Sequence, residues 1–350
     1  MNDLLALRIK KIIPETKEAI TLVLKSAELK PIPYEAGQFL TFIFNIQGKE
    51  IRRSYSLSSA PGINEDLWVT VKRIQNGEVS RYLFDTIEEG SILRSLPPAG
   101  RFTIQSDPAI PRDVFLFGAG SGIVPLFSIL KTILAKEPHS FVHLIYSNHD
   151  ESSIIFRKQL DELTEIYQDR FNCLHLLSDP ISHMANAVHM HLNSLLLEEL
   201  IGKYIQYDKK QCVFYTCGPF AYMRMIMIKL PVLGFSRTQI HREAFLPEVN
   251  ESQPEIPQDN VSAKVKIFVG DKVHSIDIPE GKTILRAALE KKIQLPFSCE
   301  TGICSTCSAH CIEGKVKMSI NEVLTEKDLS EGLVLTCTGY PVTSSVQIRF

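Results

Sequence analysis

The first hundred residues consist largely of short apolar runs that are broken by polar and turn-forming residues. Segments such as 40–45 and 67–72 mix apolar and polar positions with the alternation typical of strands that turn one face to a core. We therefore predict an all-β unit that ends near Asp107.

Beyond Asp107 the pattern changes to strands that alternate with helices. Strands are predicted at 115–117 and 142–146, and helices at 124–134 and 155–167. This rhythm is typical of a parallel sheet with helices on its faces.

A stretch rich in proline and acid, 247–260, separates this α/β unit from the C-terminal part of the chain. The predicted domains are therefore 1–107, 108–246 and 262–350, with 247–261 as a linker.

Composition excludes several classes of protein. The chain has 350 residues and a formal net charge of −2, which argues against the basic surface of a nucleic-acid-binding protein. Arg8, Lys10 and Lys11 interrupt the apolar core that an export signal needs, so we expect a cytoplasmic protein. Residues 114–130 are uncharged, but their glycines, their proline and their short length favour a strand, a turn and a helix. No membrane span is expected.

Four cysteines in the C-terminal unit carry the most specific chemistry. Cys299, Cys304 and Cys307 follow the spacing C-x4-C-x2-C, and Cys337 ends an apolar, strand-like run. In plant-type ferredoxins this spacing holds a [2Fe–2S] cluster with four thiolates. Gly302 would let the loop turn close to the cluster, where a Cβ would collide.

Zinc binding and disulfide formation account for these cysteines less well. Structural zinc usually takes two separated C-x2-C pairs, whereas Cys304 and Cys307 form a single pair. Disulfides would need an oxidising compartment. The thiols of Cys173, Cys212 and Cys311 are expected to pack among apolar residues.

The all-β unit contains residues suited to a phosphate. Arg53-Ser-Tyr-Ser56 offers a fixed positive charge, and Gly77-Glu-Val-Ser80 opens a predicted helix over 80–86 with Ser80 as its cap. Free N–H groups at a helix start bind anions. Each piece alone is common, but their order and spacing favour an anion site.

Two motifs follow strands of the α/β unit. Gly118-Ala-Gly-Ser-Gly122 comes after an apolar strand and leads to Pro125, and its glycines let the backbone approach a pyrophosphate. The spacing differs from G-x-G-x-x-G, so we expect the dinucleotide to bind differently from the standard mode. Cys217-Gly218-Pro219 lies between a predicted strand at 213–217 and a helix at 222–229, where a parallel sheet binds ligands.

In this order, the motifs resemble those of the ferredoxin–NADP reductase superfamily, and the cysteine-rich tail resembles a plant-type ferredoxin. The whole arrangement is similar to the reductase components of multicomponent oxygenases, above all the phenylacetyl-CoA epoxidase reductase group. The resemblance covers nearly the whole chain. It implies an antiparallel β-barrel flavin domain, an α/β parallel-sheet nucleotide domain and an α+β ferredoxin domain of the β-grasp type.

The resemblance also implies roles for single residues. Tyr55 would stack on the flavin ring, the Ser56 hydroxyl would approach its N5, and Cys217 would stand near the nicotinamide C4. Glu243 and Phe245 would close the flavin edge, although a solvated acid before a linker explains Glu243 equally well. The other FAD ligands would be Arg53, Val71, Lys72, Gly77, Val79 and Ser80. The other nicotinamide ligands would be Gly118, Gly120, Gly122, Pro125, Ser178, Asp179, Gly218 and Pro219.

The choice of nicotinamide depends on a strand end. Ser178-Asp179 stands where many relatives place Ser-Arg, and an acid repels a 2′-phosphate but accepts from a 2′-hydroxyl. His149 also stands where relatives often have Arg, while Arg157 and Lys158 could compensate. We therefore favour NADH. Three histidines in a polar stretch are expected to face solvent without binding metal: His183, His189 and His191.

Together these features predict an NAD(P)H-dependent reductase that passes electrons through FAD and the cluster to a partner protein. The resemblance implies that this partner is an oxygenase component. Residues 262–350 carry 11 Lys and Arg against 10 Asp and Glu, a formal +1, and a tethered domain needs little charge steering. Two alternatives are a standalone flavin reductase of the ferric or nitric-oxide type and a non-enzymatic iron–sulfur redox sensor. The hydride-handling motifs argue against the sensor.

Overall fold

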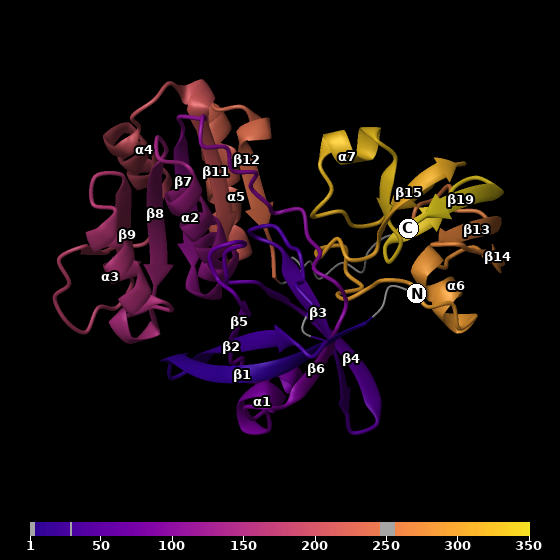
Figure 1. The fold of residues 1–350 in the computed structure, drawn as a ribbon. Helices are drawn as coiled ribbons and strands as arrows, with labels where there is room; N and C mark the ends of the chain where they lie inside the picture. Colours follow the sequence, from indigo (N-terminus) through magenta and orange to yellow (C-terminus); the bar gives the residue numbers. More distant parts are fainter. Residues whose placement is uncertain (1–3, 29, 246–255) are drawn as a thin grey trace.

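The computed structural model describes residues 4–28, 30–245 and 256–350, which form three units, each built on a main sheet; the third also has a two-stranded sheet of its own, β16-β18 (Figure 1). An antiparallel barrel, a parallel α/β sheet and a smaller mixed sheet follow one another along the chain. The predicted fold class is therefore confirmed.

The first unit is a six-stranded antiparallel sheet in the order β4-β3-β6-β1-β2-β5. A bridge between Leu57 and Val69 joins its two edge strands and closes the barrel. Helix α1 inserts Val79 and Leu83 into the barrel core. The predicted strand at 67–72 coincides with β5, and that at 40–45 lies within β3. The elements are β1 (Leu5–Thr16), β2 (Ala19–Ser26), β3 (Phe39–Ile46), β4 (Lys49–Ser56), β5 (Leu67–Lys72), α1 (Glu78–Asp85) and β6 (Ile92–Ser95).

The second unit is a parallel sheet in the order β10-β9-β8-β7-β11-β12. Its strands are β7 (Asp113–Ala119), β8 (Phe141–Asn148), β9 (Phe171–Leu177), β10 (Ala187–His189), β11 (Cys212–Cys217) and β12 (Ile240–Glu243). Its helices are α2 (Ile123–Lys136), α3 (Arg157–Ile166), α4 (Ser194–Tyr204) and α5 (Phe220–Val232), and short 3-10 turns are η1 (Gly120–Gly122), η2 (Glu151–Ser153), η3 (Lys209–Gln211) and η4 (Arg237–Gln239).

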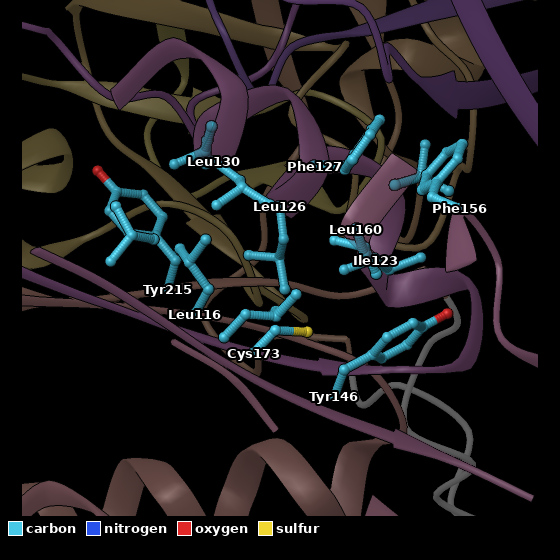
Figure 2. Close-up of a cluster of buried hydrophobic side chains, with 14 of the residues drawn as sticks. Leu116, Ile123, Leu126, Phe127, Leu130, Tyr146, Phe156, Leu160, Cys173 and Tyr215 are labelled. Atoms are coloured by element: carbon cyan, nitrogen blue, oxygen red, sulfur yellow. The ribbon is translucent and has the colours of Figure 1, made fainter. Parts of the chain in front are cut away.

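Strand β7 is apolar on both faces because helices cover both. Leu116 packs against Leu126 and Leu130 of α2 (Figure 2), whereas Phe115 and Phe117 join the core under α4 and α5. Burying a side chain of this size contributes about 1.5–3 kcal/mol. The predicted uncharged stretch is thus strand, turn and helix.

One helix begins later than predicted. We expected a helix over 155–167, but α3 starts at Arg157 because Phe156 adopts a left-handed backbone with φ 63°. A 3-10 turn with Asp150 as its cap precedes it.

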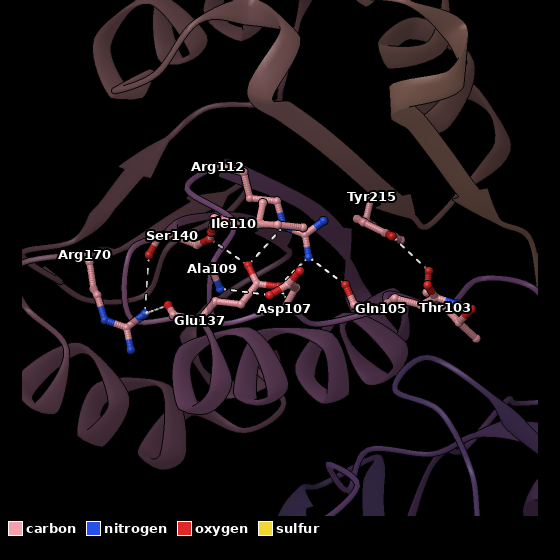
Figure 3. Close-up of polar contacts among 10 residues, drawn as sticks. All are labelled: Thr103, Gln105, Asp107, Ala109, Ile110, Arg112, Glu137, Ser140, Arg170 and Tyr215. Carbon is pink, nitrogen blue, oxygen red and sulfur yellow. Dashed lines mark hydrogen bonds and ion pairs between the residues drawn. The ribbon is translucent and has the colours of Figure 1, made fainter.

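The segment between the barrel and the α/β sheet is held by a buried carboxylate (Figure 3). Glu137 accepts hydrogen bonds from the Arg112 guanidinium, at 2.5 and 3.0 Å, and from the Asp107 N–H. The Tyr215 hydroxyl donates to the Thr103 carbonyl at 2.9 Å. The predicted boundary near 107 lies in this segment. Hydrogen bonds that join Asp107 and Thr103 to the nucleotide domain fix the connection between the two domains.

The third unit is a five-stranded sheet, β14-β13-β19-β15-β17, in which the central pair β13–β19 is parallel. Helix α6 packs Ile284, Leu285 and Ala288 onto it. The elements are β13 (Ala263–Val269), β14 (Lys272–Ile278), α6 (Ile284–Glu290), β15 (Ser308–Glu313), β16 (Val316–Met318), α7 (Glu326–Ser330), β17 (Leu333–Leu335), β18 (Gly339–Pro341) and β19 (Ser345–Arg349).

Residues 247–255 of the predicted linker lie outside the described residues. Its end belongs to the third unit, because buried Asn260 donates to the Pro341 carbonyl and accepts from the Gly281 N–H. Across residues 4–28, 30–245 and 256–350, no helix is both long and apolar enough to cross a bilayer.

Candidate cofactor-binding site

The carboxyl ends of the parallel strands bring together residues from motifs that are far apart in sequence. Cys217 of β11 pairs with Gly118 of β7 on one side and with Glu243 of β12 on the other. The strands that follow β7 in sequence, β8 to β10, lie on one side of it, whereas β11 and β12 lie on the other side. The strand order therefore reverses at β7, and ligands bind at such a reversal in open α/β sheets.

The glycine turn packs directly on the end of β11. A Cβ at Gly122 would lie 2.1 Å from the Cys217 carbonyl oxygen, so no larger residue fits. Gly120 has φ +54°, and a Cβ built there would lie 3.9 Å from the Lys72 ammonium nitrogen. A cation from the barrel therefore stands at the predicted pyrophosphate turn.

Pro125 and Pro219 fit the same turns. Pro125 lies in the first turn of α2, where a missing N–H costs no helix bond. Pro219 is the N-cap of α5, and a Cβ at Gly218 would lie 2.9 Å from the Ala119 Cβ. Proline is therefore tolerated in both turns, whereas the close packing at Gly218 leaves no room for a side chain.

Buried polar atoms without partners mark the same edge. Among the described residues, four buried side-chain atoms have no hydrogen-bond partner: Ser147 Oγ and Asn148 Nδ2 at the end of β8, Thr216 Oγ1 in β11, and His175 Nδ1 within β9. Leaving a buried polar group unsatisfied costs about 1–3 kcal/mol, and a bound polar ligand removes that cost. The strand ends therefore fit a nucleotide.

Cys217 is fully buried, and desolvation raises the pKa of its thiol well above the usual value, with a smaller contribution from Glu243. A neutral thiol is a poor nucleophile. This residue is suited to shaping the pocket beside the predicted nicotinamide, not to covalent chemistry.

Glu243 contacts the barrel. The Ser56 hydroxyl donates to its carboxylate at 3.1 Å. Burial raises the pKa of Glu243 to about 8, although the Ser56 hydrogen bond lowers it. The solvated acid considered from the sequence is therefore not what the structure shows. Phe245, two residues on, is 42% exposed.

The Arg53–Ser56 motif lies at the end of β4. The Arg53 side chain is exposed and donates to the Arg52 carbonyl at 2.7 Å. Burial raises the pKa of Tyr55, which lies beside Phe42 with ring centroids 6.2 Å apart. An exposed guanidinium beside a half-buried phenol ring suits a phosphate and a flat ring system.

The N-terminus of α1, which follows this motif in sequence, differs from the prediction. Ser80 does not cap α1: Gly77 is the N-cap, and Ser80 lies in the first turn. The Ser80 hydroxyl accepts from the Ile74 N–H and donates to the Gly77 carbonyl, so it holds the preceding loop. The N–H groups of the first turn of α1 are the donors that remain for the predicted anion site. The side chains of Val71 and Val79 lie in the barrel core, and Val71 pairs with Ile20 of β2, so neither side chain is available to a cofactor.

Ser178 and Asp179, which are predicted to contact the ribose, follow β9. This strand is separated from β7 by β8. Asp179 is 77% exposed, and its carboxylate lies 3.6 Å from His149 Nε2. The Ser178 hydroxyl lies 3.2 Å from His149 Nδ1. Arg157 and Lys158 open α3 nearby in sequence, and Lys158 pairs with Glu162 at 3.8 Å. The three histidines predicted to face solvent are exposed.

The four predicted cluster ligands converge in the third unit. The Cys299 N–H donates to Cys304 Sγ at 3.5 Å, and the Thr301 N–H donates to Cys299 Sγ at 3.4 Å. Hydrogen bonds from Cys304 and Cys337 lower the pKa of Cys299, and one from Cys337 lowers that of Cys307.

This donor set fits a two-iron cluster. Cys299 contacts Cys304 and Cys337, Cys337 contacts Cys307, and backbone N–H groups are directed at the Cys299 and Cys304 sulfurs. Four neighbouring thiols with N–H donors suit [2Fe–2S] ligation. Among the described residues no three His, Cys, Asp or Glu side chains form a group for a single metal ion. A two-iron cluster has a different requirement, because each iron takes two thiolates. Gly302 is needed for a reason that the sequence did not reveal: its Cβ would lie 2.8 Å from the Ile320 carbonyl oxygen.

The other cysteines have packing roles. Cys173 and Cys212 lie in the two cores of the α/β sheet, as predicted. Cys311 is partly buried, and its thiol donates to the Glu313 carbonyl at 3.5 Å.

The cluster loop contacts the barrel strand that carries the flavin motif. The Ser54 hydroxyl donates to the Ser298 hydroxyl at 2.8 Å, and the Arg52 guanidinium lies 4.0 Å from the Phe297 ring centroid. Ser54 lies between Arg53 and Tyr55, and Ser298 precedes Cys299. These contacts could not be predicted from the sequence, because an isolated serine or phenylalanine carries no local signal of a partner 244 residues away.

Comparisons with known proteins agree with this arrangement. Family models match an oxidoreductase FAD-binding domain at residues 5–104, an oxidoreductase NAD-binding domain at 116–227 and a 2Fe-2S iron-sulfur cluster binding domain at 267–342. The ferredoxin reductase component of 3-ketosteroid-9-alpha-monooxygenase from Rhodococcus rhodochrous is 33% identical over 98% of this chain and 96% of its own length. One of the subunits of 1,2-phenylacetyl-CoA epoxidase from Escherichia coli (strain K12) is 31% identical over 100% of this chain and 98% of its own.

A solved structure supports the fold. Phthalate dioxygenase reductase, described as a modular structure for electron transfer from pyridine nucleotides to [2Fe–2S], has a TM-score of 0.60 at 22% identity. The match covers 99% of this chain and 98% of that one. The predicted enzyme class and cofactors are thus confirmed, whereas the domain boundaries and the roles of single residues stay predictions. The chain belongs to the family of NAD(P)H-dependent oxidoreductases that join FAD-binding, NAD-binding and [2Fe–2S] domains in one polypeptide.

Proposed function

We propose that this protein takes electrons from NADH and delivers them, through FAD and its [2Fe–2S] cluster, to a separate oxygenase component. The hydrogen bond between Ser54 and Ser298 carries the proposal, because it brings the cluster loop against the strand of the flavin motif. The similarity to the ferredoxin reductase component of a ketosteroid monooxygenase and to a subunit of phenylacetyl-CoA epoxidase supports an oxygenase as acceptor.

FAD accepts electron pairs from nicotinamide and releases single electrons, which suits a one-electron cluster. The protein's residues position the parts. Arg53 and the first turn of α1 hold phosphate charge, Lys72 adds a cation at the Gly120 turn, and Cys217 shapes the nicotinamide end of the pocket. Ser56 and Glu243 keep a hydrogen bond at the contact between the barrel and the nucleotide domain.

Asp179 supports NADH over NADPH. Its carboxylate is exposed at the end of β9, where it would face a ribose that extends over the strand ends. Besides the four predicted cluster ligands, Cys173, Cys212, Cys217 and Cys311 are free thiols, which supports a reducing compartment such as the cytoplasm.

Anaerobic titration with NADH tests the proposal at its first step. Visible spectra of the purified protein should show flavin and cluster absorbance, both of which bleach with NADH. Reconstitution with purified oxygenase components of the epoxidase and of the ketosteroid monooxygenase should then show which one gains NADH-dependent product formation. Bleaching of both cofactors without electron delivery to any oxygenase would instead support a standalone flavin reductase. A cluster that NADH does not reduce would support the sensor.

A further inference from the structure

Two ion pairs join the iron–sulfur unit to the other domains. The Arg242 guanidinium lies 2.7 Å from the Glu322 carboxylate, with 31% and 25% of the two side chains exposed. The Arg101 guanidinium contacts Asp328, whose side chain is 4% exposed. Arg242 belongs to β12 of the nucleotide domain, and Arg101 follows the last barrel strand. Each of the two domains therefore contributes one arginine.

Glu322 is firmly connected to both cluster-binding segments. Its N–H donates to the Gly302 carbonyl at 3.1 Å, and Gly302 lies between Cys299 and Cys304. Two residues earlier, the Ile320 carbonyl accepts from the Thr338 hydroxyl at 2.8 Å, next to Cys337. A displacement of Glu322 would therefore displace the cluster ligands.

Arg242 is equally well connected to the flavin edge. It pairs with Thr216 in the parallel sheet, and it precedes Glu243, which accepts the Ser56 hydrogen bond. In the other ion pair, Arg101 contacts the Asp328 carboxylate. Thr325 orients this carboxylate, because its N–H and its hydroxyl both donate to Asp328 at 2.9 Å. Both ion pairs thus involve residues that are linked by further pairing or hydrogen bonds to their own domains.

We propose that Arg101 and Arg242 are positioning residues that dock the iron–sulfur unit for electron transfer between flavin and cluster, and that they do not affect hydride transfer. The physical reason is that electron transfer slows steeply with cofactor separation, whereas hydride transfer occurs within the first two domains. Partly exposed ion pairs contribute modestly each and are screened by salt. Docking held in this way is therefore sensitive to ionic strength.

Hydrogen exchange of the full chain gives a readout that is independent of catalysis. In the Arg101→Ala/Arg242→Ala double variant, peptides from β4 and from 319–325 should exchange faster, because both lie at the docking contact. Peptides from β8, in the core of the nucleotide domain, should be unchanged. The control is Arg237→Ala, which removes an exposed arginine in the turn that leads into β12.

Stopped-flow absorbance separates the two transfer steps. Flavin reduction by NADH should keep its rate in the double variant, while the following cluster reduction should slow by about two- to fivefold for each arginine removed. Unmodified protein should show slower cluster reduction, with constant flavin reduction, when salt rises from about 0.05 M to about 0.5 M.

A charge swap distinguishes a specific pair from a general structural effect. Arg242→Glu should slow cluster reduction, and Arg242→Glu combined with Glu322→Arg should restore most of the rate. The proposal is overturned if the double alanine variant leaves both exchange at β4 and the cluster-reduction rate unchanged. An equal loss of flavin reduction, or a swap that restores nothing, would also overturn it.

Discussion

Ser56 and Glu243 meet across the boundary between the barrel and the nucleotide sheet, with 3.1 Å between the hydroxyl and the carboxylate. Glu243 is also the sheet neighbour of Cys217. One hydrogen bond therefore joins the residue predicted to face the flavin N5 to the strand end predicted to hold the nicotinamide. Because burial raises the pKa of Glu243 to about 8, its carboxyl is mostly neutral at pH 7.

Replacing Glu243 with Gln should remove a pH dependence. In unmodified protein, ionisation above about pH 8 places a negative charge beside the site that accepts a hydride, and this charge opposes flavin reduction. The rate of flavin reduction by NADH should therefore fall as pH rises through about 8, and the Glu243→Gln variant should show a flatter profile. Stopped-flow measurements between about pH 6 and about pH 9.5 would check this.

The free energy of unfolding should also depend on the ionisation of Glu243. A carboxyl with a raised folded-state pKa binds its proton more tightly in the folded state, so its contribution is full below about pH 4.5 and is lost as pH rises through about 8. The free energy of unfolding of Glu243→Gln should decline less over this window. Parallel pH profiles of the two proteins, in either measurement, would refute the assignment.

Cys304→Ser should abolish the EPR signal of the reduced cluster and leave flavin bound, because flavin and cluster occupy different domains. Cys311→Ser should keep the signal, since the Cys311 thiol faces the Glu313 and Gly314 carbonyls. Loss of the cluster in the Cys311 variant would show that the ligand set is wrong.

Asp179→Arg should shift the preference from NADH toward NADPH. The side chain is 77% exposed, so we expect about 1 kcal/mol, roughly a fivefold change in the ratio of kcat/KM values. Steady-state kinetics with ferricyanide as acceptor would measure it. An unmodified protein that prefers NADPH, with a preference that the substitution does not alter, would show that Asp179 does not face the ribose.

Gly122→Ala should destabilise the nucleotide domain by about 1–3 kcal/mol or more, because the new Cβ would lie 2.1 Å from a carbonyl oxygen at the end of β11. It should also raise the KM for NADH. The matched control is Gly202→Ala within α4, where nothing lies within 4 Å of the new Cβ. That variant should gain about 0.5–1 kcal/mol of stability. Chemical denaturation of both variants would settle the comparison, and equal stabilities would contradict it.

Features that depend on neighbours in sequence were predictable. The cysteine spacing indicated a two-iron site, and the uncharged run with three glycines indicated a strand, a turn and a helix, because ligand geometry and backbone freedom are local properties. The order of the motifs was enough to expect three domains. Local reasoning failed where a backbone detail decided the outcome, as at Ser80, whose hydroxyl binds the preceding loop instead of capping α1.

The contacts between domains were decided by tertiary structure alone. Ser54 and Ser298 are 244 residues apart, and Arg242 and Glu322 are 80 apart, and none of the four is a defining residue of a motif. A polar surface residue has the same local pattern whether it meets water or another domain. Its partner is set by how the three domains fit together, and that fit depends on the shape of whole surfaces instead of on any periodicity along the chain.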